Sequence, residues 1–102
     1  MNILVTGCTG TIGSELLKAL SNNENKILGL NRRLHDPRNG VFSSSYSSEE
    51  LESIISDNKI EVVIHCAART RQSFNDIKFK ENNDLTKRLV RVCEKNNVRT
   101  FI

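Results

Sequence analysis

The sequence predicts an α/β protein built on a doubly wound parallel sheet of strand order 3-2-1-4-5, truncated within its fifth strand. Three observations carry this prediction. An apolar strand at residues 2–6 runs directly into a glycine-rich turn and then into a helical pattern. A second apolar strand follows at 26–30, and residues 60–68 are near-continuously apolar, as in a strand covered on both faces. At 102 residues the chain forms at most one domain, covering 1–102.

The first third of the chain predicts two strands joined by a helix. After the strand at 2–6, apolar residues recur at helical spacing, and the helix should end near 21–23, where polar residues gather. The apolar positions of this helix are Ile12, Leu16, Leu17 and Leu20. The strand at 26–30 follows after one crossover, which is nearly always right-handed, so the two strands should lie parallel.

The middle of the chain predicts a loop, a short strand and a capped helix. Residues 31–40 are polar and basic and contain the only proline, and a third strand is expected at 41–42. The serines that follow are typical of a linker, but Ser47 lies three residues before Glu50. This capping-box spacing favours a loop that leads into a helix. The apolar face of that helix comprises Leu51, Ile54 and Ile55.

The last third predicts a central strand, a long helix and a final strand. The apolar segment 60–68 is the clearest strand of the sequence. A helical pattern covers roughly 75–97, and its apolar face is interrupted at 80–84, which indicates a kink or a side that faces a ligand. Residues 98–102 resemble the first half of another strand. No repeat and no linker divides the chain.

Composition excludes several classes of function. The formal net charge of +3 is too small to indicate nucleic-acid binding, and no apolar stretch is long enough to predict a membrane span. The N-terminus lacks the pattern of a signal peptide. The three cysteines, Cys8, Cys66 and Cys93, are odd in number and widely spaced, so they predict neither a disulfide framework nor a metal site. A reducing cytoplasm is the simplest interpretation.

The glycine-rich turn predicts a dinucleotide-binding site. Gly7, Gly10 and Gly13 recur at a three-residue spacing between a strand and a helix, which lets the backbone approach a pyrophosphate. Thr11 and Ile12 should begin the helix, with their N–H groups facing the pyrophosphate at the positive end of the helix dipole. The alternative is a purely structural turn. A phosphate loop of the nucleotide-triphosphatase type is excluded, because no lysine follows the last glycine.

The end of the second strand favours NADP over NAD. An NAD site usually carries an acidic residue there, which binds the ribose 2′-hydroxyl. This chain has Asn31, Arg32 and Arg33 instead, and no acid before Asp36. Two arginines suit a 2′-phosphate and the adenine face. The alternative is a pair of solvated loop arginines, with NAD as the cofactor.

Small residues end the central strand. Cys66, Ala67 and Ala68 would let a cofactor pass close to the backbone at the sheet edge where such folds bind ligands. Arg69 either continues this contact or belongs to an ordinary loop. The alternative for the small residues is a tightly packed strand end. We interpret His65 as a hydrogen-bonded strand residue rather than a catalytic base.

Four segments together resemble the extended branch of the short-chain dehydrogenase/reductase superfamily, and within it the NAD-dependent epimerase/dehydratases of nucleotide sugars. Residues 6–13, TGCTGTIG, resemble its TGxxGxxG signature, and 62–68, VVIHCAA, resemble its VIHxAA strand. Residues 81–89 are similar to its xNxxGTxxL helix, and 98–102 are similar to its VKRFV strand. The resemblance covers the whole chain and implies a Rossmann-type NAD(P)-binding domain that is incomplete at its C-terminus.

Three positions bear on what this resemblance implies. Asn82 takes the place of the family's asparagine, which implies a bond to the ribose or a role in holding the neighbouring strand. Leu85 stands where the family usually has glycine, and Ser44 stands where an aspartate commonly contacts the adenine. In relatives the helix around Leu85 often joins a homodimer, whereas a solvated face is the simpler interpretation of its basic residues.

The catalytic groups that the resemblance implies are absent from this chain. The family's Ser/Thr and Tyr-x-x-x-Lys lie beyond the fifth strand, and the only tyrosine, Tyr46, is followed four residues later by Glu50. We therefore expect the NAD(P)-binding portion of a nucleotide-sugar epimerase, dehydratase or reductase, and a piece of a longer protein that by itself binds a dinucleotide without turnover. The alternatives are a non-catalytic NAD(P)-sensing regulatory module and a folded remnant that binds no ligand.

Overall fold

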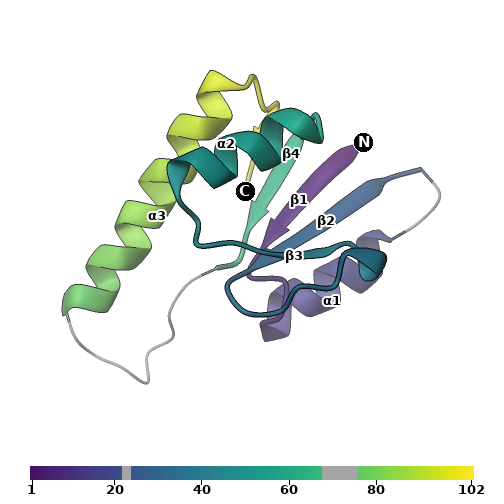
Figure 1. Cartoon of the computed structure of the whole chain (residues 1–102), viewed down its shortest axis with the longest axis horizontal. Coiled ribbons are helices and arrows are strands. Elements are labelled where there is room, and N and C mark those ends of the chain that lie inside the picture. Colours follow the sequence, from purple (N-terminus) through teal and green to yellow (C-terminus); the bar gives the residue numbers. More distant parts are fainter. Residues whose placement is uncertain (22–23, 68–75) are drawn as a thin grey trace.

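The structure, a computed structural model, describes residues 1–21, 24–67 and 76–102, with the side chains of the last helix described from residue 80. Five strands form one parallel sheet in the order β3-β2-β1-β4-β5, which confirms the predicted fold class (Figure 1). In chain order the elements are β1 (Asn2–Thr6), α1 (Thr11–Leu20), β2 (Lys26–Asn31), a 3-10 turn (Pro37–Asn39), β3 (Val41–Ser43), α2 (Ser48–Asp57), β4 (Val62–His65), α3 (Asp76–Lys95) and β5 (Thr100–Phe101).

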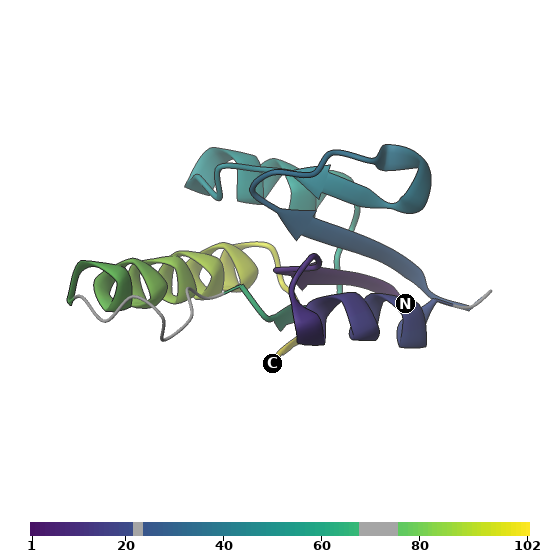
Figure 2. The ribbon, with the colours of Figure 1, turned by 90° about the horizontal axis from the view of Figure 1, so that it is seen from below.

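The sheet separates two apolar layers because successive side chains of a strand point to opposite faces. In β1, Leu4 packs into the cluster formed with α2 and α3, whereas Ile3 and Val5 pack into the cluster on the α1 side. Figure 2 shows α1 on one side of the sheet and α2 on the other. The doubly wound arrangement therefore follows from the two-residue period of a single strand.

The strand predicted at 60–68 is shorter in the structure. Ile60 ends α2 instead: its N–H donates to the Ile55 carbonyl at 3.0 Å, and Lys59 between them has a positive φ of 50°. This pattern is a Schellman motif, closed by the apolar contact that usually accompanies it. At the other end, the Thr6 hydroxyl accepts hydrogen bonds from the Cys66 and Ala67 N–H groups and so ends the β1–β4 ladder.

The expectation that β4 is covered on both faces is only half correct. Val63 is fully buried beneath the helices α2 and α3, but Val62 and Ile64 are only partly buried on the opposite face. In the described part of the chain, α1 is the helix on this face of the sheet, and it packs against β1 and β2. A continuous apolar run thus indicates a central strand without fixing how each face is covered.

The long helix is unbroken over 80–84, so the interruption of its apolar face does not mark a kink. The helix ends as α2 does. Asn97 adopts a positive φ of 57°, and the Val98 N–H donates to the Cys93 carbonyl at 3.0 Å. None of the described helices combines the length and the apolarity that crossing a bilayer requires.

The serine cluster is an ordered loop that caps α2 and not a linker. The Ser47 hydroxyl accepts a hydrogen bond from the Glu50 N–H at 3.2 Å, as the spacing predicts. The Glu50 carboxylate does not return to Ser47, as a full capping box requires. It accepts bonds from the Ser44 hydroxyl at 2.6 Å and from Ser45, and these bonds lower the pKa of Glu50. The loop between β3 and α2 therefore has a fixed shape beside the sheet edge.

Candidate functional site

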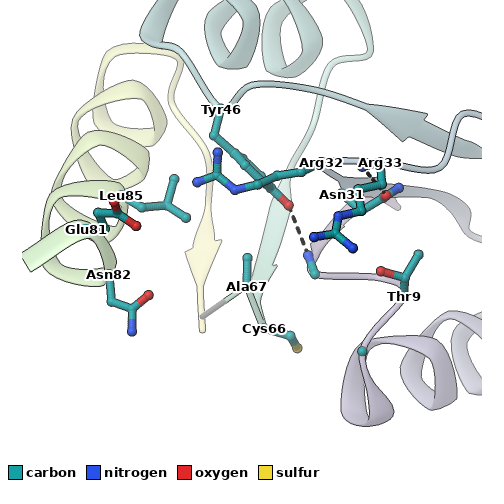
Figure 3. A pocket seen from close by; sticks show the side chains of 12 residues that line it. Thr9, Asn31, Arg32, Arg33, Tyr46, Cys66, Ala67, Glu81, Asn82 and Leu85 are labelled. Carbon is teal, nitrogen blue, oxygen red and sulfur yellow. Dashed lines mark hydrogen bonds between the residues drawn. The ribbon is translucent and has the colours of Figure 1, made fainter. Parts of the chain in front are cut away.

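A cavity of about 390 Å³ lies at the carboxyl ends of the strands, the edge where open α/β sheets bind ligands (Figure 3). Its volume falls in the range of small-molecule sites. Figure 3 shows residues of α3 on one side of the cavity and the glycine turn on the other. The lining residues are Gly7, Thr9, Gly10, Asn31, Arg32, Arg33, Tyr46, Cys66, Ala67, Glu81, Asn82 and Leu85.

Two glycines of the turn are required by the fold itself. Gly7 has a positive φ of 67°, and a Cβ there would lie 2.7 Å from the Ala67 backbone nitrogen. A Cβ on Gly13 would overlap the Gly7 carbonyl oxygen and lie 3.0 Å from the Cys8 Cα. Both contacts are with backbone, which cannot rotate away. These two positions let β1, β4 and the start of α1 pack closely.

Gly10 is not required in the same way. Its φ of −75° suits any residue, and the nearest atom to a Cβ there is the Gly7 carbonyl oxygen at 3.4 Å. Gly10 is the N-cap of α1, yet it has no side chain to satisfy the first N–H groups of the helix. Because Gly10 lines the cavity and has no side chain, the space in front of its backbone is open. Gly10 therefore fits a site where a ligand approaches the backbone closely.

The start of α1 presents free backbone donors. The first intrahelical bond runs from the Ser14 N–H to the Gly10 carbonyl at 2.9 Å. In the described part of the chain, no hydrogen bond uses the N–H groups of Thr11, Ile12 or Gly13. The Ile12 side chain is 69% exposed. Such an open N-terminus favours an anion, because the N–H groups and the helix dipole both face it.

Asn31 holds the loop that follows β2. Its side-chain oxygen accepts bonds from the Arg33 and Leu34 N–H groups at 2.9 and 2.6 Å, and its amide donates to the Leu34 carbonyl at 2.8 Å. The residue is buried and lines the cavity. Because both ends of this side chain already have protein partners, Asn31 shapes the site by presenting the two arginines that follow it.

Arg32 and Arg33 are exposed and line the cavity, and no acidic residue stands beside them at the end of β2. The Arg32 guanidinium lies 5.0 Å from the centre of the Tyr46 ring and donates to the Ser45 carbonyl at 3.3 Å. This cation–π contact holds the guanidinium in place and does not neutralise its positive charge. This edge of the cavity is therefore positively charged, as the sequence predicts.

Tyr46 lines the cavity, but sequence analysis did not identify it as a site residue, and the same holds for Thr9 and Glu81. The Tyr46 side chain is buried to 1% exposure, and its hydroxyl accepts a bond from the Gly7 N–H at 3.2 Å and donates to the Leu30 carbonyl at 2.9 Å. Burial raises the pKa of the Tyr46 hydroxyl. The phenol thus ties the glycine turn to the end of β2 (Figure 3). Its place after a strand was the only indication in the sequence.

The end of β4 supplies small residues, as predicted. Cys66 and Ala67 line the cavity, and their N–H groups both donate to the Thr6 hydroxyl. The other two predicted positions, Ala68 and Arg69, lie outside the described residues. The part of the cavity wall that directly follows β4 is therefore backbone and small side chains, held to the end of β1 by the Thr6 hydroxyl.

The side of α3 that interrupts its apolar face lines the cavity. Asn82 lines it together with Glu81. Leu85, which stands in place of a family glycine, is buried between α3 and the sheet and also lines the cavity. Ser44 is not among the lining residues, since its hydroxyl is bonded to Glu50. Spacing of three and four residues on a helix would have grouped Leu85 with Asn82 and Glu81.

Among the described residues, no three His, Cys, Asp or Glu side chains gather into a metal site. The geometry therefore defines a cavity with the N-cap of α1 in its wall, two arginines along one edge and small residues along another. The predicted positions Thr11, Ile12 and Gly13 follow that N-cap and are not among the lining residues. The N-cap, the arginines and the small residues together are the parts of a dinucleotide-binding domain at the edge of a parallel sheet.

The family model of the NAD dependent epimerase/dehydratase family matches residues 3–102, and the chain belongs to that family. It is 29% identical over 114 residues to ADP-L-glycero-D-manno-heptose-6-epimerase of Brachyspira hyodysenteriae, covering 97% of this chain and 35% of that protein. UDP-N-acetylglucosamine 4-epimerase from Bacillus cereus aligns with a TM-score of 0.80 at 31% identity, over 96% of this chain and 34% of that one.

A third relative shows the fold. UDP-glucose 4-epimerase of Thermus thermophilus, solved as a complex with NAD, aligns with a TM-score of 0.83 at 23% identity, over 99% of this chain and 36% of that one. The chain therefore spans about a third of the length of the relatives it matches. These matches confirm the family and the Rossmann-type architecture predicted from the four sequence segments.

Proposed function

We propose that this chain forms the NAD(P)-binding portion of a nucleotide-sugar epimerase, dehydratase or reductase. The observation that carries the proposal is the start of α1, where three N–H groups without an acceptor in the described chain directly follow Gly10, which lines the cavity. A dinucleotide diphosphate placed there would accept bonds from Thr11 and Ile12. Family membership supports NAD dependence at this site.

The residues of the chain would hold and orient the cofactor. The turn would bind the diphosphate, and the small residues Cys66 and Ala67 would let the chain of the cofactor pass beside β4 toward α3. Asn82 lies where it would contact a ribose or the strand beside it. When bound, the nicotinamide supplies hydride transfer, and the sugar carbon would be the reacting centre in a longer protein.

We further propose that the cofactor is NADP in preference to NAD. Arg32 and Arg33 line the cavity after β2, where an acid would be needed to bind a free 2′-hydroxyl. Arg32 is held over Tyr46, so its charge is placed before a ligand arrives. Charge-assisted bonds to a phosphate suit guanidinium groups.

Isothermal titration with NADPH and NADH tests this preference. We expect the double variant Arg32→Ala, Arg33→Ala to lose about tenfold or more in NADPH affinity, and to change little toward NADH, because one charge-assisted bond contributes about 1.5 kcal/mol. Arg38→Ala is the matched control, since Arg38 is exposed and does not line the cavity. Equal losses for both cofactors in the double variant would remove the 2′-phosphate argument.

The regulatory alternative has no support in the comparisons. The relatives named above are epimerases, and two of them act on sugars linked to UDP by the wording of their names. No observation in the described chain points to a partner that would read out a sensing event. The epimerase-type assignment is therefore the one we carry forward.

A further inference from the structure

His65 lies at the end of β4, where its ring contacts β1, α3 and β5. Its Nδ1 atom is 2.7 Å from the Thr6 hydroxyl of β1, and its Nε2 atom is 3.2 Å from the Thr86 hydroxyl of α3. The ring also lies 6.0 Å from the Phe101 ring of β5. Thr6 directly precedes Gly7, so the residue that the His65 ring contacts on β1 is adjacent to the glycine turn.

The hydrogen bonds around Thr6 fix the proton on the ring. A hydroxyl has one donor and two acceptor sites. The Thr6 hydroxyl oxygen accepts bonds from the Ala67 N–H at 3.2 Å and from the Cys66 N–H at 3.1 Å, and the Cys66 N–H is shared with the Thr6 carbonyl oxygen at 3.2 Å. Two N–H donors are thus directed at the hydroxyl oxygen. This arrangement leaves the Thr6 O–H to donate to Nδ1 of His65, so Nδ1 carries no proton.

The same accounting continues across the ring to α3. With Nδ1 unprotonated, a neutral His65 carries its proton on Nε2 and donates it to the Thr86 oxygen. The Thr86 O–H in turn donates to the Asn82 carbonyl at 3.0 Å. The Nε2-protonated tautomer of His65 therefore satisfies every group in this series of hydrogen bonds. An imidazolium would turn a further donor toward the Thr6 hydroxyl oxygen, at which two N–H donors are already directed.

We propose that neutral, Nε2-protonated His65 is a positioning residue that holds the ends of β1 and β4 and the cavity-lining turn of α3 in register, and that protonation of its ring loosens the dinucleotide cavity. The effect on the dinucleotide rests on the proposed function, whereas the hydrogen bonds of His65 do not depend on it. It is carried by the fact that Ala67 and Asn82, at the two ends of the chain of bonds, both line the cavity.

Among the described residues, the direct partners of the ring carry no charge. β1 carries no ionisable side chain, and the ring's direct partners are hydroxyl groups and an aromatic ring. The neighbouring segments carry ionisable groups, among them the Cys66 thiol directly after β4, Glu81 on α3 and Arg99 before β5, which is paired with Glu61 at 3.9 Å. Burial lowers the pKa of His65. The neutral form therefore prevails at neutral pH.

A nitrogen-15 NMR titration of the ligand-free chain tests the hydrogen bonds directly. At pH 7 we expect Nδ1 of His65 to resonate as an unprotonated nitrogen and Nε2 as a protonated one. As the pH falls below about 6.5, the Ala67 amide should shift together with the ring. A ring protonated on Nδ1 at pH 7, or an Ala67 amide that does not follow the ring, would overturn the inference.

Variants of Thr86 test the consequence for binding, because Thr86 does not line the cavity. Thr86→Val removes the acceptor for Nε2, and we expect it to weaken NADPH binding about tenfold at pH 8, whereas Thr86→Ser should bind within about twofold of the parent. Equal affinities for the valine and serine variants would refute the positioning role. If the NMR result holds but the parent chain binds no dinucleotide, the proposed function fails and the hydrogen-bonded arrangement of His65 stands.

Discussion

The three glycines of the turn should differ sharply in what an alanine does at each. At Gly13, an added Cβ overlaps the Gly7 carbonyl oxygen and lies within 3.0 Å of the Cys8 Cα, and both neighbours are backbone. Forcing a methyl into such a contact costs about 3 kcal/mol. For a chain of this size that loss lowers the melting temperature by roughly 15 °C.

At Gly10 the same substitution should leave the fold intact. The nearest atom is 3.4 Å from the added Cβ, and the φ of −75° is unstrained. Alanine is a slightly poorer N-cap than glycine but reduces the freedom of the unfolded chain, so the two effects offset to within about 1 kcal/mol. The methyl would, however, occupy the place proposed for the diphosphate, which should cost about 2 kcal/mol, or about thirtyfold in Kd.

Differential scanning calorimetry with and without NADPH separates the two effects. At a hundredfold excess over Kd, the ligand should stabilise the parent chain by about 2.7 kcal/mol, a rise of roughly 15 °C. At the same concentration, a thirtyfold weaker Gly10→Ala variant should gain only about 0.9 kcal/mol. Gly13→Ala should melt low even without ligand.

Two results would refute this reasoning. A Gly10→Ala chain that keeps the full ligand-induced rise would mean that the diphosphate does not lie against Gly10. A Gly13→Ala chain as stable as the parent would mean that α1 does not approach the Gly7 carbonyl as closely as described.

Three further predictions concern the residues around the site and the core. Tyr46→Phe should lower the free energy of unfolding by about 2 kcal/mol in urea titration, because the Gly7 N–H loses its acceptor and the Leu30 carbonyl keeps only the Cys8 N–H; an unchanged midpoint would contradict the bond. Ser47→Ala should lose about 1 kcal/mol as an N-cap, and Ser48→Ala, one residue inside the helix, should lose much less; equal losses would exclude capping. Burial raises the pKa of Cys93 to about 11, so at pH 8 it should react with iodoacetamide only after unfolding; fast labelling of the native chain would contradict its burial.

The fold followed from the sequence because its determinants are local and periodic. The alternation in β1 sends Leu4 to one apolar layer and Val5 to the other, and the Ser47 cap lies three residues from the N–H it satisfies. The boundary error at Ile60 has a physical cause: an apolar residue can close a helix by packing back on it as readily as it can start a strand. The direction of the chain at such a residue depends on the φ of the residue before it, Lys59.

Sequence analysis singled out cavity-lining residues that directly follow a strand, and did not single out pairs of side chains that meet across the fold. The glycine turn and the arginines after β2 are adjacent in sequence to the strands that place them. Tyr46 reaches the Gly7 N–H over a separation of 39 residues, and His65 reaches Thr6 over 59. Such pairs depend on the order of the strands and on the depth of each side chain, which the pattern of a single segment does not contain.

The central claim is that the N–H groups at the start of α1 bind the diphosphate of a dinucleotide, and an NMR titration of the amide signals with NADPH tests it most directly. We predict that the Thr11 and Ile12 amide protons move downfield by more than any other described amide, since they would gain a charged acceptor. Unchanged Thr11 and Ile12 signals at millimolar NADPH, or shifts confined to the far surface of α2 and α3, would contradict it.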